Sequence, residues 1–208
     1  TIEEYKERAF SNNIEEMKNY TTFAVNIAKD AYEKSKIENV KARKATYLKS
    51  QTDFLFAMIT KIYEDQKNKI PEAELKKVLL DAIGSVRYGE DNDYFFVYDK
   101  NSTILKLPLT PEREGTKNTG SHIKEFIKTA FEKGEGFVPY QQVIPGKAPR
   151  EKLSNVRLFE PYEWVVGTGV YIDNEEKELK AKALEEISKI RFGQDGYFFV
   201  YDYDGTNI

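Results

Sequence analysis

Two short motifs decide the fold of this chain: Arg87-Tyr88-Gly89 and, four residues later, Tyr94-Phe95-Phe96-Val97-Tyr98-Asp99. The same pair returns as Arg191-Phe192-Gly193 and Tyr197-Phe198-Phe199-Val200-Tyr201-Asp202. The similarity extends backwards into the apolar spacing of the residues that precede each copy, at 75–86 and 179–190. A repeat of this size is typical of a supersecondary unit, here a helix followed by a strand, that the chain begins twice.

The composition predicts a folded domain without a nucleic-acid partner. Of 208 residues, 40% are hydrophobic and 13% are aromatic, which is enough for a packed core. The 35 acidic and 32 basic residues are finely mixed and leave a net charge of −3, with no basic block that would neutralise phosphates. Because the chain has no Cys, disulfides and thiolate sites are excluded.

The two ends of the sequence predict a segment of a longer protein. The sequence starts at Thr1 with neither Met nor a signal sequence and stops at Ile208, shortly after a strand signal. No apolar run approaches the roughly 18 residues that a membrane span requires. Any membrane-spanning segment is therefore expected outside the given sequence.

Residues 1–67 contain no Gly and no Pro, and their apolar residues return at helical spacing. This pattern predicts one very long helix or two helices end to end. Such a helix is longer than a small domain is wide, so part of it must project or pair with a second copy. A solvated spacer and a dimer seam are both compatible with its upstream half. Docking on a core is predicted only near its end, by Phe54, Leu55, Met58, Ile59 and Ile62.

The middle of the chain predicts an α+β module. Pro71 is expected in the first turn of a second helix that ends before Gly89, and Ser121 is expected to cap a third helix. Strand signals cover 94–99, 103–107, 137–144, 152–159 and 164–171. We therefore expect five antiparallel strands with a helix between the second and the third.

The repeat divides the chain into three parts. Residues 1–67 form the long N-terminal helix, which serves as stalk and docking element, and residues 68–173 form the first module. Residues 174–208 form a connecting helix and the first hairpin of a second, incomplete module. A two-stranded fragment is marginal alone, so this hairpin is expected either to lean on the first module or to belong to a second module whose remainder lies outside the given sequence.

Residue types for catalysis and metal binding are scarce. His122 is the only histidine, and its place beside Ser121 favours a surface position at a helix start. Gly167-Thr168-Gly169 lacks the third glycine of a dinucleotide loop, so its glycines are interpreted as sites of backbone crowding or turns. Asp202-Tyr203-Asp204-Gly205 lacks the other ligands of a calcium loop and predicts a β-turn. We therefore expect no enzyme activity, no cofactor and no metal.

Alternation along the first strand places Tyr94, Phe96 and Tyr98 on one face. Tyrosine rings give apolar walls with hydroxyl tips, which suit a cavity for a small polar molecule. Ordinary core and edge positions explain the same spacing, and the residues alone leave both interpretations open. The candidates that would complete a site are Tyr140, Gln142, Lys152, Asn155 and Arg157.

The motifs of this chain resemble those of Cache sensor domains of the second type. The resemblance covers residues 50–173, and the restart at 179 resembles the double-module version. It implies a PAS-like sheet and the extracytoplasmic ligand-binding part of a bacterial transmembrane receptor, such as a chemoreceptor, a histidine kinase or a cyclic-dinucleotide enzyme. The motifs that carry the resemblance are Arg87-Tyr88-Gly89, Tyr94–Asp99, Gly134–Tyr140, Lys152–Val156 and Trp164–Asp173.

By position, the resemblance implies a pocket that uses Tyr94, Phe96, Tyr140, Lys152 and Trp164, with Tyr98 on the same strand. Three positions depart from the family pattern. Leu107 stands where a His is usual, Asn155 where a Tyr is usual, and Gln142 where an aromatic residue is usual.

These departures remove two hydrogen-bond donors for a carboxylate, so short acids such as acetate and pyruvate are expected to bind poorly. Lys152 remains as a charge partner, and the two amides suit an amide-bearing or zwitterionic ligand. The expected partners are a small metabolite (an organic acid, an amino acid or an amide-bearing ligand) and a second copy paired through the long helix, with a membrane anchor and no nucleic acid. The alternative is a protein-interaction or dimerisation module with a degenerate pocket, which Leu107 favours.

Overall fold

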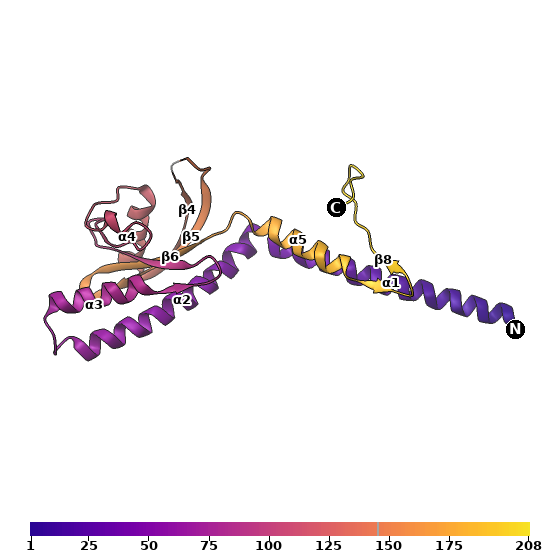
Figure 1. Ribbon diagram of the computed structural model, residues 1–208, viewed down its shortest axis with the longest axis horizontal. Coiled ribbons are helices and arrows are strands. Elements are labelled where there is room, and N and C mark those ends of the chain that lie inside the picture. Colours follow the sequence, from indigo (N-terminus) through magenta and orange to yellow (C-terminus); the bar gives the residue numbers. More distant parts are fainter. Residues whose placement is uncertain (145) are drawn as a thin grey trace. The chain divides into compact units, whose positions relative to one another are not determined.

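The computed structural model describes residues 1–144 and 146–208. The chain forms two compact units, one of residues 41–173 and one of residues 1–40 with 174–208. Each unit is described separately below (Figure 1).

Two helices form one side of the unit of residues 41–173. Most of α2 (Ile37–Gln66) belongs to it, and α2 buries Leu48, Thr52, Leu55 and Ile59, which recur every three or four residues on one face. The helix α3 (Glu72–Ser85) buries Leu75, Leu79 and Ile83. Pro71 is the N-cap of α3 rather than a residue of its first turn, because its extended ψ of 145° lies outside the helical region.

The sheet of this unit is antiparallel throughout. Its strand order is β1-β2-β6-β5-β4, and β3 also pairs with β2. The strands are β1 (Arg87–Tyr88), β2 (Asp93–Tyr98), β3 (Ile104–Lys106), β4 (Glu135–Gln142), β5 (Arg150–Phe159) and β6 (Trp164–Tyr171). Two short 3-10 helices, η1 (Pro111–Arg113) and η2 (Glu160–Tyr162), lie in the connections. The α+β prediction is confirmed, and the short β1 is an addition to the five expected strands.

The two faces of the sheet are covered by different helices (Figure 1). Phe95 and Val97 of β2 pack in one cluster with the buried residues of α2 and α3, whereas Phe96 and Tyr98 pack with α4 (Ser121–Lys133). The N-cap of α4 is Gly120, so Ser121 is the first helical residue and not the expected cap. Alternation along β2 therefore separates a helix-packed core from the α4 face.

Glycines on the α4 face of β6 admit their neighbours. A Cβ at Gly167 would lie 2.6 Å from the Phe96 ring and 2.9 Å from Val156. A Cβ at Gly169 would overlap Ser154 Oγ and lie 2.9 Å from the Leu153 carbonyl oxygen. The interpretation of these two glycines as sites of backbone crowding is confirmed.

Polar groups lie between α2 and the sheet. Thr168 Oγ1 is 2.5 Å from the Tyr88 hydroxyl and donates to the Tyr94 carbonyl at 2.7 Å. Thr52 Oγ1 and Asn155 Oδ1 are buried without a hydrogen-bond partner among the described residues. A buried oxygen without a hydrogen-bond partner lowers the free energy of unfolding, so the contact between α2 and the sheet is not optimised for stability alone.

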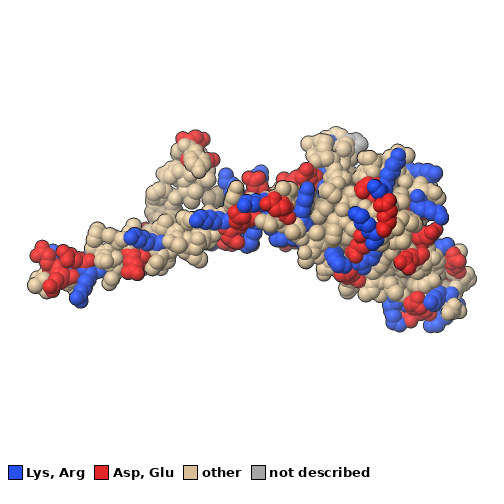
Figure 2. Space-filling view, turned by 180° about the vertical axis from the view of Figure 1, so that it is seen from behind, with Lys and Arg blue, Asp and Glu red and all other residues tan. Residues whose placement is uncertain are grey.

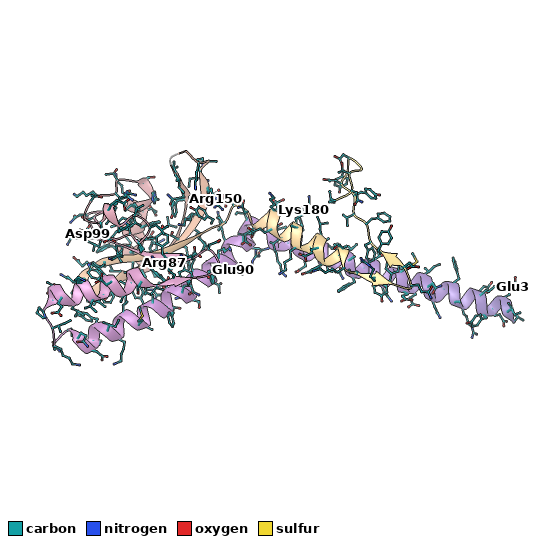
Figure 3. The ribbon with its side chains drawn as sticks, viewed as in Figure 1. Glu3, Arg87, Glu90, Asp99, Arg150 and Lys180 are labelled. Atoms are coloured by element: carbon teal, nitrogen blue, oxygen red, sulfur yellow. The ribbon has the colours of Figure 1, made fainter. Side chains whose placement is uncertain are left out.

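Ion pairs also connect α2 to the sheet. Arg157 of β5 pairs with Asp53 of α2 and, at 2.7 Å, with Glu135 of β4. Its guanidinium lies 4.7 Å from the centre of the Phe56 ring. At the start of β5, Arg150, which is labelled in Figure 3, donates two hydrogen bonds of 2.8 and 2.9 Å to Asp173. Elsewhere Lys and Arg are interspersed with Asp and Glu over the face in Figure 2, which agrees with the mixed charge of the sequence.

The second unit contains α1 (Ile2–Ser35), α5 (Glu175–Ser188), β7 (Arg191–Phe192) and β8 (Gly196–Tyr197). Its buried helical residues include Ala24 of α1 and Ala183 and Ile187 of α5. Of the two expected alternatives for residues 1–67, one long helix or two helices, the structure has two, because Lys36 has an extended ψ of 135°. The hairpin is also shorter than its counterpart, since β8 has two residues and β2 has six.

Candidate functional site

A cavity of about 500 Å³ lies on the α4 face of the sheet, within the unit of residues 41–173. Strands β2, β4, β5 and β6, helix α4 and the loop after β3 supply its walls. Its lining includes seven of the ten residues named from the sequence: Tyr94, Phe96, Tyr98, Leu107, Tyr140, Gln142 and Lys152. Residues from distant parts of the chain thus meet at one hollow of a size that suits small ligands.

The other three residues lie on the opposite face of the sheet, which differs from the expectation. Arg157 pairs with Asp53 of α2 and is absent from the cavity lining. Asn155 is fully buried and donates from Nδ2 to the Gly136 carbonyl at 3.2 Å. Trp164 packs with Phe159 and Tyr162 in the core under α2 and α3. Neither side chain lines the cavity. Of the two amide side chains that suggested an amide-bearing ligand, only that of Gln142 lines the cavity.

Lys152 is the buried cation of this cavity. It lies opposite Tyr140 of β4 and Tyr171 of β6, and its side chain is 8% exposed. Nζ is 5.6 Å from the Tyr94 ring centre and 5.1 Å from that of Tyr171. No carboxylate of the described residues lies within 4.0 Å of this ammonium group.

Burial lowers the pKa of Lys152, and the nearby negative charge of Asp93 partly opposes this effect. Burial of the Asp93 carboxyl itself, followed by the charge of Asp91, raises the pKa of Asp93. A desolvated ammonium group that faces a cavity gains most from a bound anion, because an anion replaces the hydration that the group has lost.

His122 lies at the start of α4, as expected, but it is half-buried and lines the cavity instead of standing free at the surface. Its ring is stacked on Tyr140, with the ring centres 4.7 Å apart and the planes inclined by 3°. It contacts Phe126 edge-on at 5.6 Å. Burial, followed by the charge of Lys152, lowers the pKa of His122, so the imidazole is neutral at pH 7.

Farther along β2, a second polar group of residues lines the cavity. Asn118 Nδ2 donates to the Tyr98 hydroxyl at 3.2 Å, and Arg113 and Thr110 stand beside them in the lining. None of the residues Asn118, Arg113 and Thr110 is among the candidates that the sequence predicts, because all lie in the connection between β3 and α4. The spacing of residues within a loop does not predict where their side chains point, so no sequence pattern indicates that these residues face the cavity.

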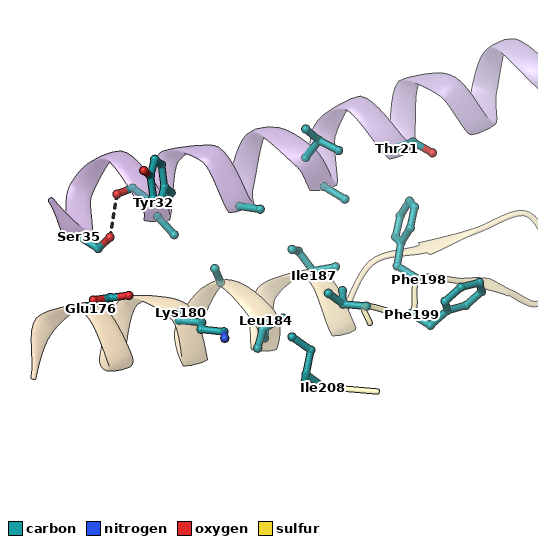
Figure 4. A pocket seen from close by; sticks show the side chains of 16 residues that line it. Thr21, Tyr32, Ser35, Glu176, Lys180, Leu184, Ile187, Phe198, Phe199 and Ile208 are labelled. Carbon is teal, nitrogen blue, oxygen red and sulfur yellow. Dashed lines mark hydrogen bonds between the residues drawn. The ribbon is translucent and has the colours of Figure 1, made fainter. Parts of the chain in front are cut away.

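The unit of residues 1–40 and 174–208 has a separate groove of about 470 Å³ (Figure 4). Its walls are α1, α5 and the segment after β8, and Glu176 and Lys180 lie toward one end. Small side chains line the α1 side, namely Ala24, Ala28 and Ala31. The groove is predominantly apolar and offers few groups that would orient a polar ligand.

The described residues 1–144 and 146–208 contain no group of three or more His, Cys, Asp or Glu side chains placed to hold a metal ion. Over the same residues, every helix falls short of the length and apolar character needed to cross a membrane.

The sequence matches the family described as Cache domain over residues 1–208. Methyl-accepting chemotaxis protein McpP of Pseudomonas putida is 28% identical over 122 residues, which are 55% of this chain and 22% of that protein. Sensor histidine kinase MctS of Rhizobium johnstonii is 32% identical over 166 residues, which are 74% of this chain and 35% of that protein. The chain thus spans about a third or less of these relatives.

Solved structures of sensor domains are also similar to this chain. A Cache chemosensory domain studied for carboxylic acid recognition is 26% identical, with a TM-score of 0.58 over 65% of this chain and 98% of that one. A periplasmic sensor domain of a chemotaxis protein is 27% identical, with a TM-score of 0.56 over 64% of this chain and 96% of that one.

Proposed function

This chain belongs to the Cache domain family and is homologous to sensor domains of chemoreceptors and histidine kinases, and from this premise we propose that its cavity binds a small organic anion beside Lys152. The chain would act as the extracytoplasmic ligand-sensing part of a bacterial transmembrane receptor. The similar periplasmic sensor domain of a chemotaxis protein supports this location.

One observation carries the proposal. Lys152 is 8% exposed, and the described residues offer its ammonium group no carboxylate partner within 4.0 Å. The rings of Tyr94 and Tyr171 flank it and exclude water from two sides. A charge-assisted hydrogen bond to a ligand carboxylate contributes about 1.5–3 kcal/mol at such a site.

Binding without catalysis is the role that these residues support. His122 stacks on Tyr140 and stands beside a cation, and the described part of the lining has no carboxylate or thiol that would act with it as a general base or nucleophile. The solved Cache domain that recognises carboxylic acids supports an anion as ligand.

We further propose that α1 pairs with α1 of a second copy in the intact, membrane-anchored receptor. Its upstream half exposes an apolar stripe of residues, namely Ile2, Tyr5, Phe10, Ile14 and Met17. The division into a helix (1–67), a first module (68–173) and the start of a second module (174–208) is part of the same proposal, supported by the internal repeat.

Calorimetry and thermal unfolding with acetate, propionate, pyruvate, butyrate and succinate test the proposed function. We expect at least one acid to bind, and an acid at 100 times its Kd should stabilise the chain by about 2.7 kcal/mol. The Lys152→Met variant should bind that acid about 10- to 150-fold more weakly. Lys124→Gln removes a cation from the exposed side of α4 and is the control.

Two results would contradict the proposal. If no acid binds, the alternative of a degenerate pocket in a dimerisation or interaction module gains support. If an acid binds equally well to the Lys152→Met variant, the site lies elsewhere.

A further inference from the structure

The cavity has polar groups at two separate places along β2. Tyr94, Phe96 and Tyr98 follow one another on the cavity face of the strand, with Lys152 at the Tyr94 ring and Asn118 at the Tyr98 hydroxyl. Four residues of a strand place Tyr94 and Tyr98 about 13 Å apart.

Aromatic surface fills the space between these two places. The ring of Phe96 stacks on that of Phe126 of α4, with centres 5.4 Å apart. A ligand that reaches both polar places therefore needs an apolar middle.

Arg113 stands at the Tyr98 end as a second cation. It lines the cavity, and its charge favours the ionised form of Tyr98. The neighbouring carboxylate of Glu114 accepts from the Leu107 N–H at 2.9 Å and lies 3.4 Å from Lys106 Nζ. No acid among the described residues lies within ion-pair distance of the Arg113 guanidinium.

The described lining of the cavity contains Lys152, Arg113 and His122 but neither Asp nor Glu. Asp93 acts on Lys152 from outside the lining. The ammonium group of an amino acid would therefore find no anionic partner in the cavity, whereas two separated carboxylates would each find a cation.

We propose that the ligand is a linear dicarboxylate whose first carboxylate binds Lys152 and whose second binds at Arg113, with Asn118 and Tyr98 beside it. The strand from Tyr94 to Tyr98 separates these two places, so the ligand needs several carbons between its carboxylates, and chains of about four to six carbons cover the range to be tested. The inference rests on the proposed function, because Lys152 anchors one end of the ligand.

The test compares acids that differ only in the second carboxylate: succinate with butyrate, glutarate with valerate, and adipate with hexanoate. Calorimetry on the chain of residues 1–208 should show that at least one diacid binds about 10-fold more tightly than its matched monoacid. The preference should decrease as salt is raised, since Arg113 is exposed to solvent.

Variants assign that preference to a residue. Arg113→Gln should reduce the diacid to the affinity of its monoacid, Arg113→Lys should retain part of the preference, and Lys124→Gln should leave it intact. Equal affinity for each diacid and its monoacid, with a large loss in Lys152→Met, would overturn the inference and leave the proposed function standing. If no acid of either class binds, both are overturned.

Discussion

Replacement of Lys152 by Met should make the ligand-free protein more stable while it removes the ligand response. The Lys152 side chain is 8% exposed and has no carboxylate within 4.0 Å among the described residues. A buried ion costs several kcal/mol, and contacts with the rings of Tyr94 and Tyr171 offset about 1 kcal/mol each. The ammonium group also faces the cavity, so we take the net cost as about 1–2 kcal/mol.

Met has a similar length and no charge, so the variant should recover this free energy of unfolding. For a chain of this size, about 1–2 kcal/mol corresponds to a rise in Tm of roughly 3–6 °C. Thermal denaturation followed by circular dichroism without ligand measures it. A lower Tm in the Lys152→Met variant would refute the reasoning, because it would show that the lysine stabilises the empty fold.

The pH dependence gives a second check. Burial lowers the pKa of Lys152 below its ordinary value of 10.5, with Asp93 opposing and Arg150 adding to the shift. Between the lowered and the ordinary pKa, the unfolded chain binds more protons than the folded one, so the stability of the unmodified protein rises with pH. The cost is therefore complete below the lowered pKa and disappears as the pH approaches 10.5. The advantage of the Met variant should shrink between pH 7 and pH 10.

Three further changes test other parts of the structure. Gly167→Ala should lower the free energy of unfolding by about 1–3 kcal/mol in urea, because its methyl group would meet the Phe96 ring, and an unchanged midpoint would show that the ring has room. Thr52→Val replaces a hydroxyl group without a partner and should raise that free energy by about 1 kcal/mol, whereas a loss would reveal a partner for the hydroxyl. His122→Phe keeps a ring beside Tyr140 and should abolish an increase in acid affinity of about 3- to 10-fold that is expected as the pH falls below the ordinary pKa of 6.5 and His122 becomes protonated. Identical pH profiles of binding would remove His122 from the site.

Most of the secondary structure could be predicted from the alternation of apolar residues and from turn residues in the sequence. Strict alternation along 94–98 predicted which residues of β2 share a face, and the structure places Phe96 and Tyr98 in one cluster and Phe95 and Val97 in the other. The break between α1 and α2 was beyond such reasoning, because Lys36 is neither Gly nor Pro and its extended backbone depends on tertiary context.

For two residues, Asn155 and His122, the structure differs from the position expected from the sequence, and the reasons are different. Lys152 and Asn155 are three residues apart in one strand, so the two-residue period of a strand places their side chains on opposite faces. For Asn155 this period predicts the correct face, whereas the position in the family pattern does not. The stack of His122 on Tyr140 joins a helix start to a strand 18 positions later in the sequence. No local pattern encodes a contact of that kind, because it depends on how α4 packs on the sheet.

The position of Trp164 gives the protein an internal optical reporter. It is the only tryptophan of the chain, it is 5% exposed, and it packs with Phe159 and Tyr162 on the face of the sheet opposite the cavity. A molecule in the cavity therefore does not touch the indole ring. Any change in tryptophan emission during a titration would report a rearrangement between the sheet and helices α2 and α3, while calorimetry on the same sample reports occupancy.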